Sequence, residues 1–116
     1  MFFACQSGYT RIAELIIEHK GRVNQQNKRD YGTPLLVASQ NGHTSCVNFL
    51  LNHGANVNHQ LKDGATSLFL AAQGGHVHTV DALIRSGADI NLFKKVRIIN
   101  TNTVIAIKTN LIIKLL

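Results

Sequence analysis

Apolar side chains recur in this sequence at helical spacing, in short blocks that are separated by glycine-containing turns. One block covers residues 34–40 and a second covers residues 46–51, and in both the apolar or small side chains repeat with a helical period. This spacing places them on one face of a helix. Gly42 separates the two blocks and Gly54 follows the second, where glycine suits the left-handed end of a helix. The pattern predicts two short antiparallel helices joined by a turn.

The first block opens with a helix-start signal. Thr33 has a side-chain oxygen that can accept a hydrogen bond from a backbone N–H of the first turn. Pro34 follows at the first helical position, where its missing N–H does no harm. We therefore expect Thr33 to be the N-cap of this helix.

The same pattern recurs along the chain at a fixed spacing. Residues 30–58 lie over residues 63–91 at an offset of 33 without a gap. Such self-similarity is typical of repeat proteins, in which each copy is one supersecondary unit. The identical pairs are Asp30/Asp63, Thr33/Thr66, Leu35/Leu68, Ala38/Ala71, Gln40/Gln73, Gly42/Gly75, His43/His76, Val47/Val80, Leu50/Leu83, Gly54/Gly87, Ala55/Ala88 and Asn58/Asn91.

An earlier copy fits at an offset of 34. The extra residue falls in the connector 25–32, because a loop is where an insertion costs least. One helical pair cannot bury its own apolar face, so the copies are expected to stack on one another. The matching residues of this copy are Ala4, Gln6, Gly8, Val23 and Asn24, with Ile12, Ala13, Ile16 and Ile17 on its second helix.

These copies resemble the ankyrin repeat over roughly residues 3–92. The resemblance implies an all-α fold, an ankyrin-repeat solenoid of stacked helix-turn-helix units with short β-hairpin fingers. It rests on Gly32-Thr33-Pro34-Leu35, Asn41-Gly42-His43 and Gly54-Ala55-Asn56-Val57-Asn58 in one copy, and on Asp63-Gly64-Ala65-Thr66, Leu70-Ala71-Ala72, Gly75-His76 and Gly87-Ala88-Asp89-Ile90-Asn91 in the next.

The repeat pattern divides the chain into an array over 1–92 and a tail over 93–116. We expect a partial repeat at 1–28, which lacks its finger and the start of its first helix, and repeats at 29–61 and 62–92. A fourth copy is not expected, because an isoleucine stands where its threonine would fall.

Two departures from the family pattern bear on the surface. Leu36 and Phe69 replace the histidine that follows Thr-Pro-Leu in the family, so a polar contact is lost and we expect a larger apolar surface near the inner helix.

The ends of the array are also expected to lie open, with Ile12 and Ile16 at the first end. At the other end the exposed set would be Val80, Leu83 and Ile84 unless the tail covers them. Low stability or self-association would follow.

The net charge of +6 over 116 residues invites a nucleic-acid hypothesis, but its distribution argues against one. Residues 1–92 carry seven basic side chains and all six acidic ones, whereas residues 93–116 carry five basic side chains and no acid. A nearly neutral body with a basic end is weak evidence for nucleic-acid binding. We expect neither nucleic acid nor a membrane to be the main partner.

The tail 93–116 contains no glycine, proline or acid, and three interpretations stay open. It forms a strand or helix that caps the last repeat. Alternatively it is disordered and sticky, since Val104–Ile107 is rich in β-branched residues. In the third interpretation it derives from a non-coding or alternative exon and has no selected structure. Its interleaved lysines also leave an interfacial membrane anchor open, although no clean amphipathic face supports one.

No arrangement of residues in the sequence indicates catalysis. His43 and His76 are expected to bond to the backbone in the turn between helices, whereas His53 and His59 are expected to be solvated near the finger. His78 lies close to His76, but no cysteine or carboxylate completes a tetrahedral metal set. The glycines mark turns and helix ends and do not form a phosphate loop. We expect no enzyme activity, no metal and no cofactor.

The two cysteines favour a reduced, intracellular protein, because two cannot staple a small secreted domain. Cys46 stands at an apolar helical position, where a buried thiol is favoured over a reactive one. Cys5 stays open because its copy is truncated. The start of the chain shows no signal peptide, and no run of about 18 apolar residues predicts a membrane span. We expect the cytoplasm, with the nucleus as an alternative.

The resemblance implies a protein-interaction module that contacts its partner through the finger tips and the exposed inner-helix positions. The partner is a protein of unknown identity, no small-molecule substrate is expected, and the basic tips mildly favour an acidic or hydrogen-bonding peptide. The candidate contact residues are Lys28, Arg29, Asp30, Tyr31, Lys62, Asp63 and Ala65 on the fingers, and Gln40, Asn41 and Gln73 on the inner helices, where Gln6 begins a glutamine ladder.

Two other functions stay open. The chain could be a regulatory or targeting segment of a larger ankyrin-containing enzyme or scaffold. The tail could instead bind nucleic acid or an anionic membrane, in which case the binding should depend steeply on salt.

Overall fold

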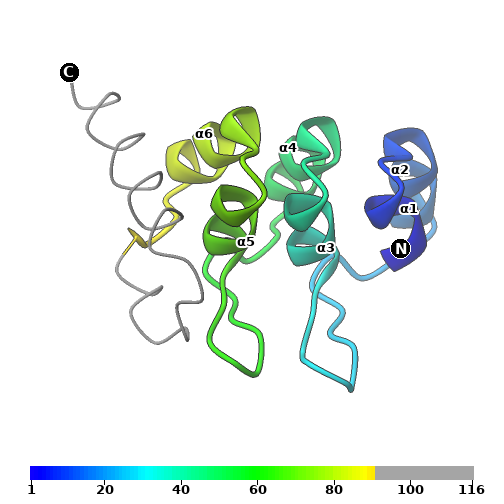
Figure 1. The fold of residues 1–116 in the computed structure, drawn as a ribbon. Helices are drawn as coiled ribbons and strands as arrows, with labels where there is room; N and C mark the ends of the chain where they lie inside the picture. The colour runs from blue at the N-terminus through cyan, green and yellow to red at the C-terminus, as the bar shows by residue number, and fades with distance from the viewer. Residues whose placement is uncertain (91–116) are drawn as a thin grey trace.

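The computed structural model describes residues 1–90 and contains six helices in that range, arranged as three helix-turn-helix pairs. The helices α1, α3 and α5 lie side by side in one layer, and α2, α4 and α6 form a second layer (Figure 1). The arrangement confirms the all-α repeat fold. The bounds are α1 Phe2–Gln6, α2 Thr10–Glu18, α3 Pro34–Gln40, α4 Thr44–Asn52, α5 Ser67–Gln73 and α6 Val77–Arg85.

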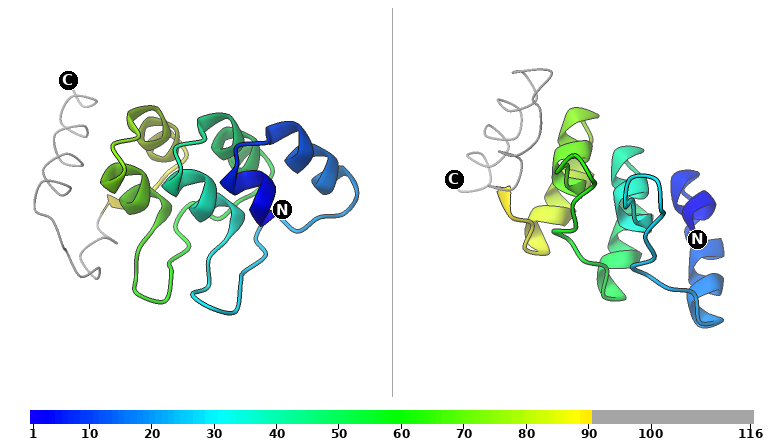
Figure 2. Two further views of the ribbon diagram at one scale, coloured as in Figure 1. Left: turned by 45° about the vertical axis from the view of Figure 1, so that its right-hand side comes forward. Right: turned by 90° about the horizontal axis from the view of Figure 1, so that it is seen from below.

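Two hairpin-like fingers precede α3 and α5 and project away from the helices (Figure 1). Figure 2 shows the three helix pairs stacked in chain order, with the fingers extending from the same side of the stack. Within residues 1–90 the fingers have no strand, because single backbone hydrogen bonds close them instead of a ladder. The tail 93–116 lies outside the described residues, and so do all the predictions made for it.

The helices α1, α3 and α5 are the inner helices of the repeats, and α3 and α5 begin with the threonine caps that the sequence predicts. The Thr33 hydroxyl oxygen accepts a hydrogen bond from the backbone N–H of Leu36 at 3.4 Å, which confirms Thr33 as the N-cap of α3. Thr66 caps α5 in the same way, with Phe69 as the donor at 3.2 Å. A side-chain cap of this kind satisfies one backbone N–H that the helix itself leaves without a partner.

The apolar core runs through all three helix pairs as one cluster. Leu36 and Phe69 are 2% and 5% exposed, so the expectation that they enlarge the apolar surface was wrong. Val80 and Leu83 are also buried within this cluster and Ile84 is partly exposed, but the expectation of an open face there depended on the tail, which lies outside the described residues. Both α4 and α5 pack against α6.

The first edge of the stack is open, as the repeat pattern predicted. Ile12 and Leu15 of α2 are 48% and 41% exposed, and Ile16 is partly buried. The residues that match Ile12 in the next two pairs, Cys46 and Thr79, are both fully buried. The difference arises because the preceding helix pair covers each of those two positions, whereas no described pair precedes α2.

A histidine ladder joins successive helix pairs. The Nε2–H of His43 donates to the backbone carbonyl of Gln6 at 2.8 Å, and that of His76 donates to the carbonyl of Gln40 at 3.0 Å. These bonds confirm that both histidines bond to the backbone. Each ring also lies over a glycine of the preceding turn: a Cβ on Gly42 would come closer than 3.0 Å to the His76 ring. The glycine therefore serves the packing between repeats as well as the turn.

An asparagine ladder joins the same pairs at the opposite end of the helices. The side-chain amide of Asn24 donates to the carbonyl of Gly54 at 3.0 Å and accepts from the N–H of Asn56 at 2.8 Å. The carbonyl oxygen of the Asn58 side chain accepts from the N–H of Asp89 at 2.7 Å. The repeat alignment identified these asparagines as equivalent, but it did not show that they bridge neighbouring pairs.

One helix end departs from the glycine rule. Lys20 has φ +70°, and it stands at the position that Gly54 and Gly87 occupy, with φ +87° and +91°, in the other two pairs. A side chain with a Cβ pays a steric cost in this left-handed region, whereas glycine does not. The first pair therefore carries local strain at the end of α2.

Lys20→Gly is expected to stabilise the full chain by about 0.5–1 kcal/mol, because it removes the left-handed strain at the cost of some unfolded-state entropy. Urea unfolding followed by circular dichroism measures the change. Lys20→Ala is the matched control, since it removes the charge but keeps a Cβ at the same φ, and it should give no gain. An equal gain from both variants would show that the lysine charge, and not the backbone, is responsible.

Gly42→Ala is expected to destabilise the chain by about 2 kcal/mol or more, since the new methyl group meets the His76 ring and also sits at positive φ. Gly54→Ala is the control, because Gly54 shares the positive φ and has no described atom within 4 Å of a Cβ. It should cost about 1 kcal/mol. Urea unfolding of both variants measures the difference, and equal losses would contradict the packing role of the glycine.

Candidate partner-binding surface

The first finger, residues 27–32, is a turn held by its own side chains. The Asn27 side-chain oxygen accepts from the N–H groups of Arg29 and Asp30 at 3.1 and 3.0 Å, and the Asp30 carboxylate accepts from the N–H of Gly32 at 3.0 Å. The Asn27 N–H donates to the Gly32 carbonyl at 2.9 Å and closes the loop. Asn and Asp are suited to such turns because their short side chains bond to nearby backbone. The exposed Lys28 and Arg29 side chains are thus carried on an ordered tip.

The second finger, residues 61–65, uses the same chemistry. The Leu61 N–H donates to the Ala65 carbonyl at 2.8 Å, and the Asp63 carboxylate accepts from the Ala65 N–H at 2.9 Å. Lys62 and Asp63 are exposed, as expected of contact residues. Ala65 is 2% exposed, so its prediction as a contact residue was wrong. Its side chain belongs to the core cluster, and only its backbone serves the finger.

The two finger tips are joined to each other. The Lys62 N–H donates to the Asp30 carbonyl at 2.9 Å, and the Lys62 ammonium lies 5.9 Å from the centre of the Tyr31 ring, within cation–π range. The His59 Nε2–H donates to the Tyr31 carbonyl at 2.7 Å. His59 is partly exposed, so the expectation of a solvated side chain holds in part, but the residue also ties the base of one finger to the tip of the other. These bonds combine the two tips into one surface.

Tyr31 is held in a strained conformation at this surface. Its φ is +66°, in the left-handed region, and the matching residue of the second finger is Gly64, with φ +92°. Its side chain is 46% exposed. A non-glycine residue in this region costs free energy and persists only where surrounding bonds hold it, a condition that often marks functional positions. The hydrogen bond from His59 and the contact with Lys62 are the bonds that hold it here.

The predicted inner-helix residues lie at the other end of the inner helices. Gln40 and Gln73 are exposed at the C-terminal ends of α3 and α5, as is Gln6 in α1. A seven-residue helix is about 10 Å long, and the fingers extend beyond its start, so these glutamines and the finger tips are separated by more than one helix length. The structure thus places the predicted contacts in two groups, not in one compact patch.

Two residues that the sequence did not single out connect these groups. Val37 and Leu70 are partly exposed and lie three residues before Gln40 and Gln73, on the same helix face. Asn41 is exposed, but its amide donates to the Val37 carbonyl at 2.8 Å, so its donor is committed to the end of α3. The equivalence of Val37 and Leu70 across the offset of 33 was the sequence signal that could have identified them.

The tip charges are mixed. Lys28, Arg29 and Lys62 are cations, while Asp30 and Asp63 direct their carboxylates at the N–H groups of their own turns. Because turn formation already occupies one oxygen of each carboxylate, the cations are the more available groups for a charged partner.

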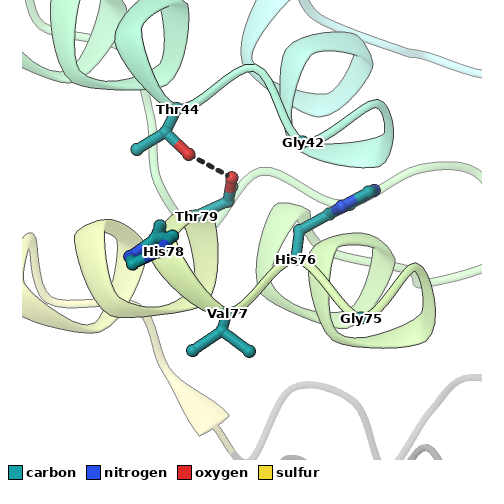
Figure 3. A pocket seen from close by; sticks show the side chains of 7 residues that line it. All are labelled: Gly42, Thr44, Gly75, His76, Val77, His78 and Thr79. Atoms are coloured by element: carbon teal, nitrogen blue, oxygen red, sulfur yellow. Dashed lines mark hydrogen bonds between the residues drawn. The ribbon is translucent and has the colours of Figure 1, made fainter.

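An open depression of roughly 340 Å³ lies between the last two helix pairs, on the turn side of the stack (Figure 3). Two histidines border it, but His76 already donates to Gln40, and His78 is exposed on α6. Among residues 1–90, no three His, Cys, Asp or Glu side chains come together as a metal-binding group. The lining consists of Gly42, Thr44, Gly75, His76, Val77, His78 and Thr79.

His53 lies at the end of α4, not near a finger. Its Nδ1–H donates to the Phe49 carbonyl at 2.9 Å, and its exposed ring packs on the Phe49 ring with centroids 4.2 Å apart. It therefore caps the helix end and makes no contribution to the candidate surface. In the same described part of the chain, no helix is long and apolar enough to cross a membrane.

A family comparison agrees with this architecture. The family model for ankyrin repeats, in three copies, matches residues 1–94, and the chain belongs to the ankyrin repeat family. Ankyrin repeats are generally protein-interaction modules.

Curated relatives share part of the sequence. The chain is 48% identical over 61 residues to ankyrin repeat domain-containing protein 29 of Danio rerio, which covers 52% of this chain and 20% of that protein. It is 36% identical over 63 residues to alpha-latrotoxin-Lh1a of Latrodectus hasselti, a match that covers 54% of this chain and 4% of that protein. It is 38% identical over 56 residues to the ankyrin repeat and KH domain-containing protein mask of Drosophila melanogaster, a match that covers 47% of this chain and 1% of that protein. The matched region is thus a small part of each of these relatives.

Tyr31→Gly is expected to raise the free energy of unfolding modestly, by about 0.5 kcal/mol, because relief of the left-handed strain exceeds the lost cation–π contact. Tyr31→Ala keeps the strain and loses the ring, so it should be less stable than the natural protein. Urea unfolding that ranks the variants Gly, Tyr, Ala in falling stability supports strain at this tip. If Tyr31→Ala matched or exceeded Tyr31→Gly, Tyr31 would not be strained.

Proposed function

We propose that this chain is a non-catalytic protein-interaction module that binds its partner through the joined finger tips and the exposed face of the inner helices. The observation that carries the proposal is the strained and exposed Tyr31, held by His59 and Lys62 where the two fingers meet. Tyrosine is enriched among the residues that dominate protein interfaces, because it offers a large contact area together with a hydroxyl group.

The chemistry of the tips favours an acidic, extended peptide segment as the partner. Lys28, Arg29 and Lys62 supply positive charge around Tyr31, and complementary charge mainly speeds and orients association. Gln40 and Gln73 each supply a donor and an acceptor, more than one helix length away, and Val37 and Leu70 offer apolar contact between the two groups. A peptide that follows this face would meet charge first and hydrogen-bonding groups last.

The module comprises the array 1–92 in this proposal, with its three repeats bounded as the sequence pattern predicts. A second candidate function is favoured by the comparisons: the matched region covers between 1% and 20% of the curated relatives. The chain would then act as a regulatory or targeting segment within a larger ankyrin-containing protein. The binding surface is the same in both cases, so a test of the surface applies to both.

Selection of peptides from a random displayed library against the full chain tests the surface directly. We expect the selected peptides to be rich in Asp and Glu. Their affinity should fall by about tenfold or more for the combined variant Lys28→Glu, Arg29→Glu and Lys62→Glu, as is common when complementary interface charges are reversed.

A variant with the same change in net charge provides the control. Arg11→Glu, Lys20→Glu and Arg85→Glu reverse three exposed cations on α2, just after α2 and on α6, away from the fingers. They should leave the affinity within about twofold, since solvent-exposed charges outside an interface contribute little. Equal losses in both variants would indicate a general charge effect. Unchanged binding in the finger variant would refute the proposed surface.

A further inference from the structure

Two glutamines at equivalent positions border the surface between the inner helices α3 and α5. Gln40 is the last residue of α3 and Gln73 is the last residue of α5, and both are exposed. The two helices lie side by side and pack on each other (Figure 1). Packed helices have axes about 8–10 Å apart. The two glutamines thus stand on either side of one narrow strip, the α3–α5 strip, which Val37 and Leu70 border one helical turn earlier.

Neither glutamine side chain is used by the fold. Among residues 1–90, no group forms a hydrogen bond with the side-chain amide of Gln40 or Gln73. The neighbouring Asn41 is different, since its amide donates to the Val37 carbonyl and completes the end of α3. A side-chain amide has two N–H donors and an acceptor oxygen. The pair therefore keeps its full hydrogen-bonding capacity for a ligand.

The histidine ladder fixes the position of Gln40 relative to Gln73. His76 follows Gln73 by three residues, in the turn after α5, and its Nε2–H donates to the Gln40 backbone carbonyl at 3.0 Å. Gly74 permits this approach, because a Cβ there would lie 2.5 Å from the His76 Nε2 atom. The end of α3 is thus bound to the turn that follows α5. The spacing of the two residues is set before a ligand arrives, which lowers the entropic cost of binding.

An extended peptide has the backbone groups that such a pair can bind. The C=O and N–H of one trans peptide group point to opposite sides of a strand, and a bonded partner lies about 4.7–4.9 Å away on each side. Partners on the two sides are therefore about 10 Å apart, which matches the spacing of packed helices. A helical ligand is a poor match, because its backbone groups are already bonded within the helix.

The joined finger tips lead into this strip. The first finger precedes α3 and the second precedes α5, so the contact between Tyr31 and Lys62 lies at the finger end of the strip. Two extended and four helical residues separate Tyr31 from Val37, so their Cα atoms are at most about 13 Å apart. An extended ligand covers that distance in about four residues. The cations of the tips complement acidic residues at this end of the ligand.

We propose that Gln40 and Gln73 form a two-amide clamp that holds one backbone peptide group of an extended ligand segment. One glutamine donates an N–H to the ligand C=O, and the other accepts the ligand N–H with its side-chain oxygen. The ligand is a peptide with acidic residues at the finger tips and an apolar residue between Val37 and Leu70. The clamped group follows that residue within about two positions, because one helical turn advances about 5 Å. This inference rests on the proposed function and adds the conformation and register of the ligand.

A backbone scan of a selected peptide tests the clamp. The probe is an acidic peptide selected on the full chain, with each of its backbone N–H groups replaced in turn by N-methyl, which removes one donor at a time. We expect a sensitive N–H within about two positions of an apolar residue, with a loss of about fivefold in affinity, as is typical of a lost hydrogen bond. Isothermal titration calorimetry measures each affinity.

Matched variants identify the partner of the sensitive N–H. For one of the two variants Gln40→Ala and Gln73→Ala, the unmodified and the methylated peptide should bind almost equally, because the bond is already lost. The other variant should weaken both peptides alike, since it removes the donor to the C=O. Gln6→Ala is the control: it changes the same residue type at the end of α1, outside the strip, and should leave the affinity within about twofold.

Two results would overturn the clamp while the finger variant still weakens binding. The first is a scan in which no N-methyl effect depends on Gln40 or Gln73. The second is a set of selected peptides whose apolar residues recur at helical spacing, because a helix keeps its backbone groups for itself. In both cases the proposed function stands without the clamp. Unchanged binding in the finger variant counts against both, since the register of the clamp is measured from the finger tips.

Discussion

Each helix pair in this chain has an apolar face that only a neighbouring pair can cover, and the rest of the structure depends on this constraint. Ile12, Cys46 and Thr79 occupy equivalent positions in α2, α4 and α6. Cys46 and Thr79 are fully buried because a preceding pair covers them, whereas Ile12, which no described pair precedes, is 48% exposed. Burial of apolar surface is the main favourable term in folding. The stack therefore owes its stability to the interfaces between pairs more than to the pairs themselves.

Polar ladders give these apolar interfaces a fixed register. The histidine ladder and the asparagine ladder each repeat once per interface, at opposite ends of the helices. Each of these bonds pairs a side chain with a backbone group that a loop would otherwise leave to water, so a shift in register would break several bonds at once. The ladders also set where the fingers emerge, and through them the spacing of Tyr31 and Lys62.

Strain is located where the repeats differ from one another. Lys20 and Tyr31 occupy left-handed positions at which the sister repeats have glycine. Packing does not require these exceptions, because the sister repeats fold without them. They are accordingly the positions at which this chain differs from a plain structural stack.

The sequence by itself determined the repeat, the helix starts at Thr33 and Thr66, the backbone bonds of His43 and His76, and the membership of a stacked fold. These features depend on local chemistry or on periodicity, which a sequence displays directly. Tertiary structure alone decided that Ala65 and Leu36 are buried and that His59 bonds to Tyr31. Each of these depends on contacts between residues far apart in the chain, which no local pattern encodes.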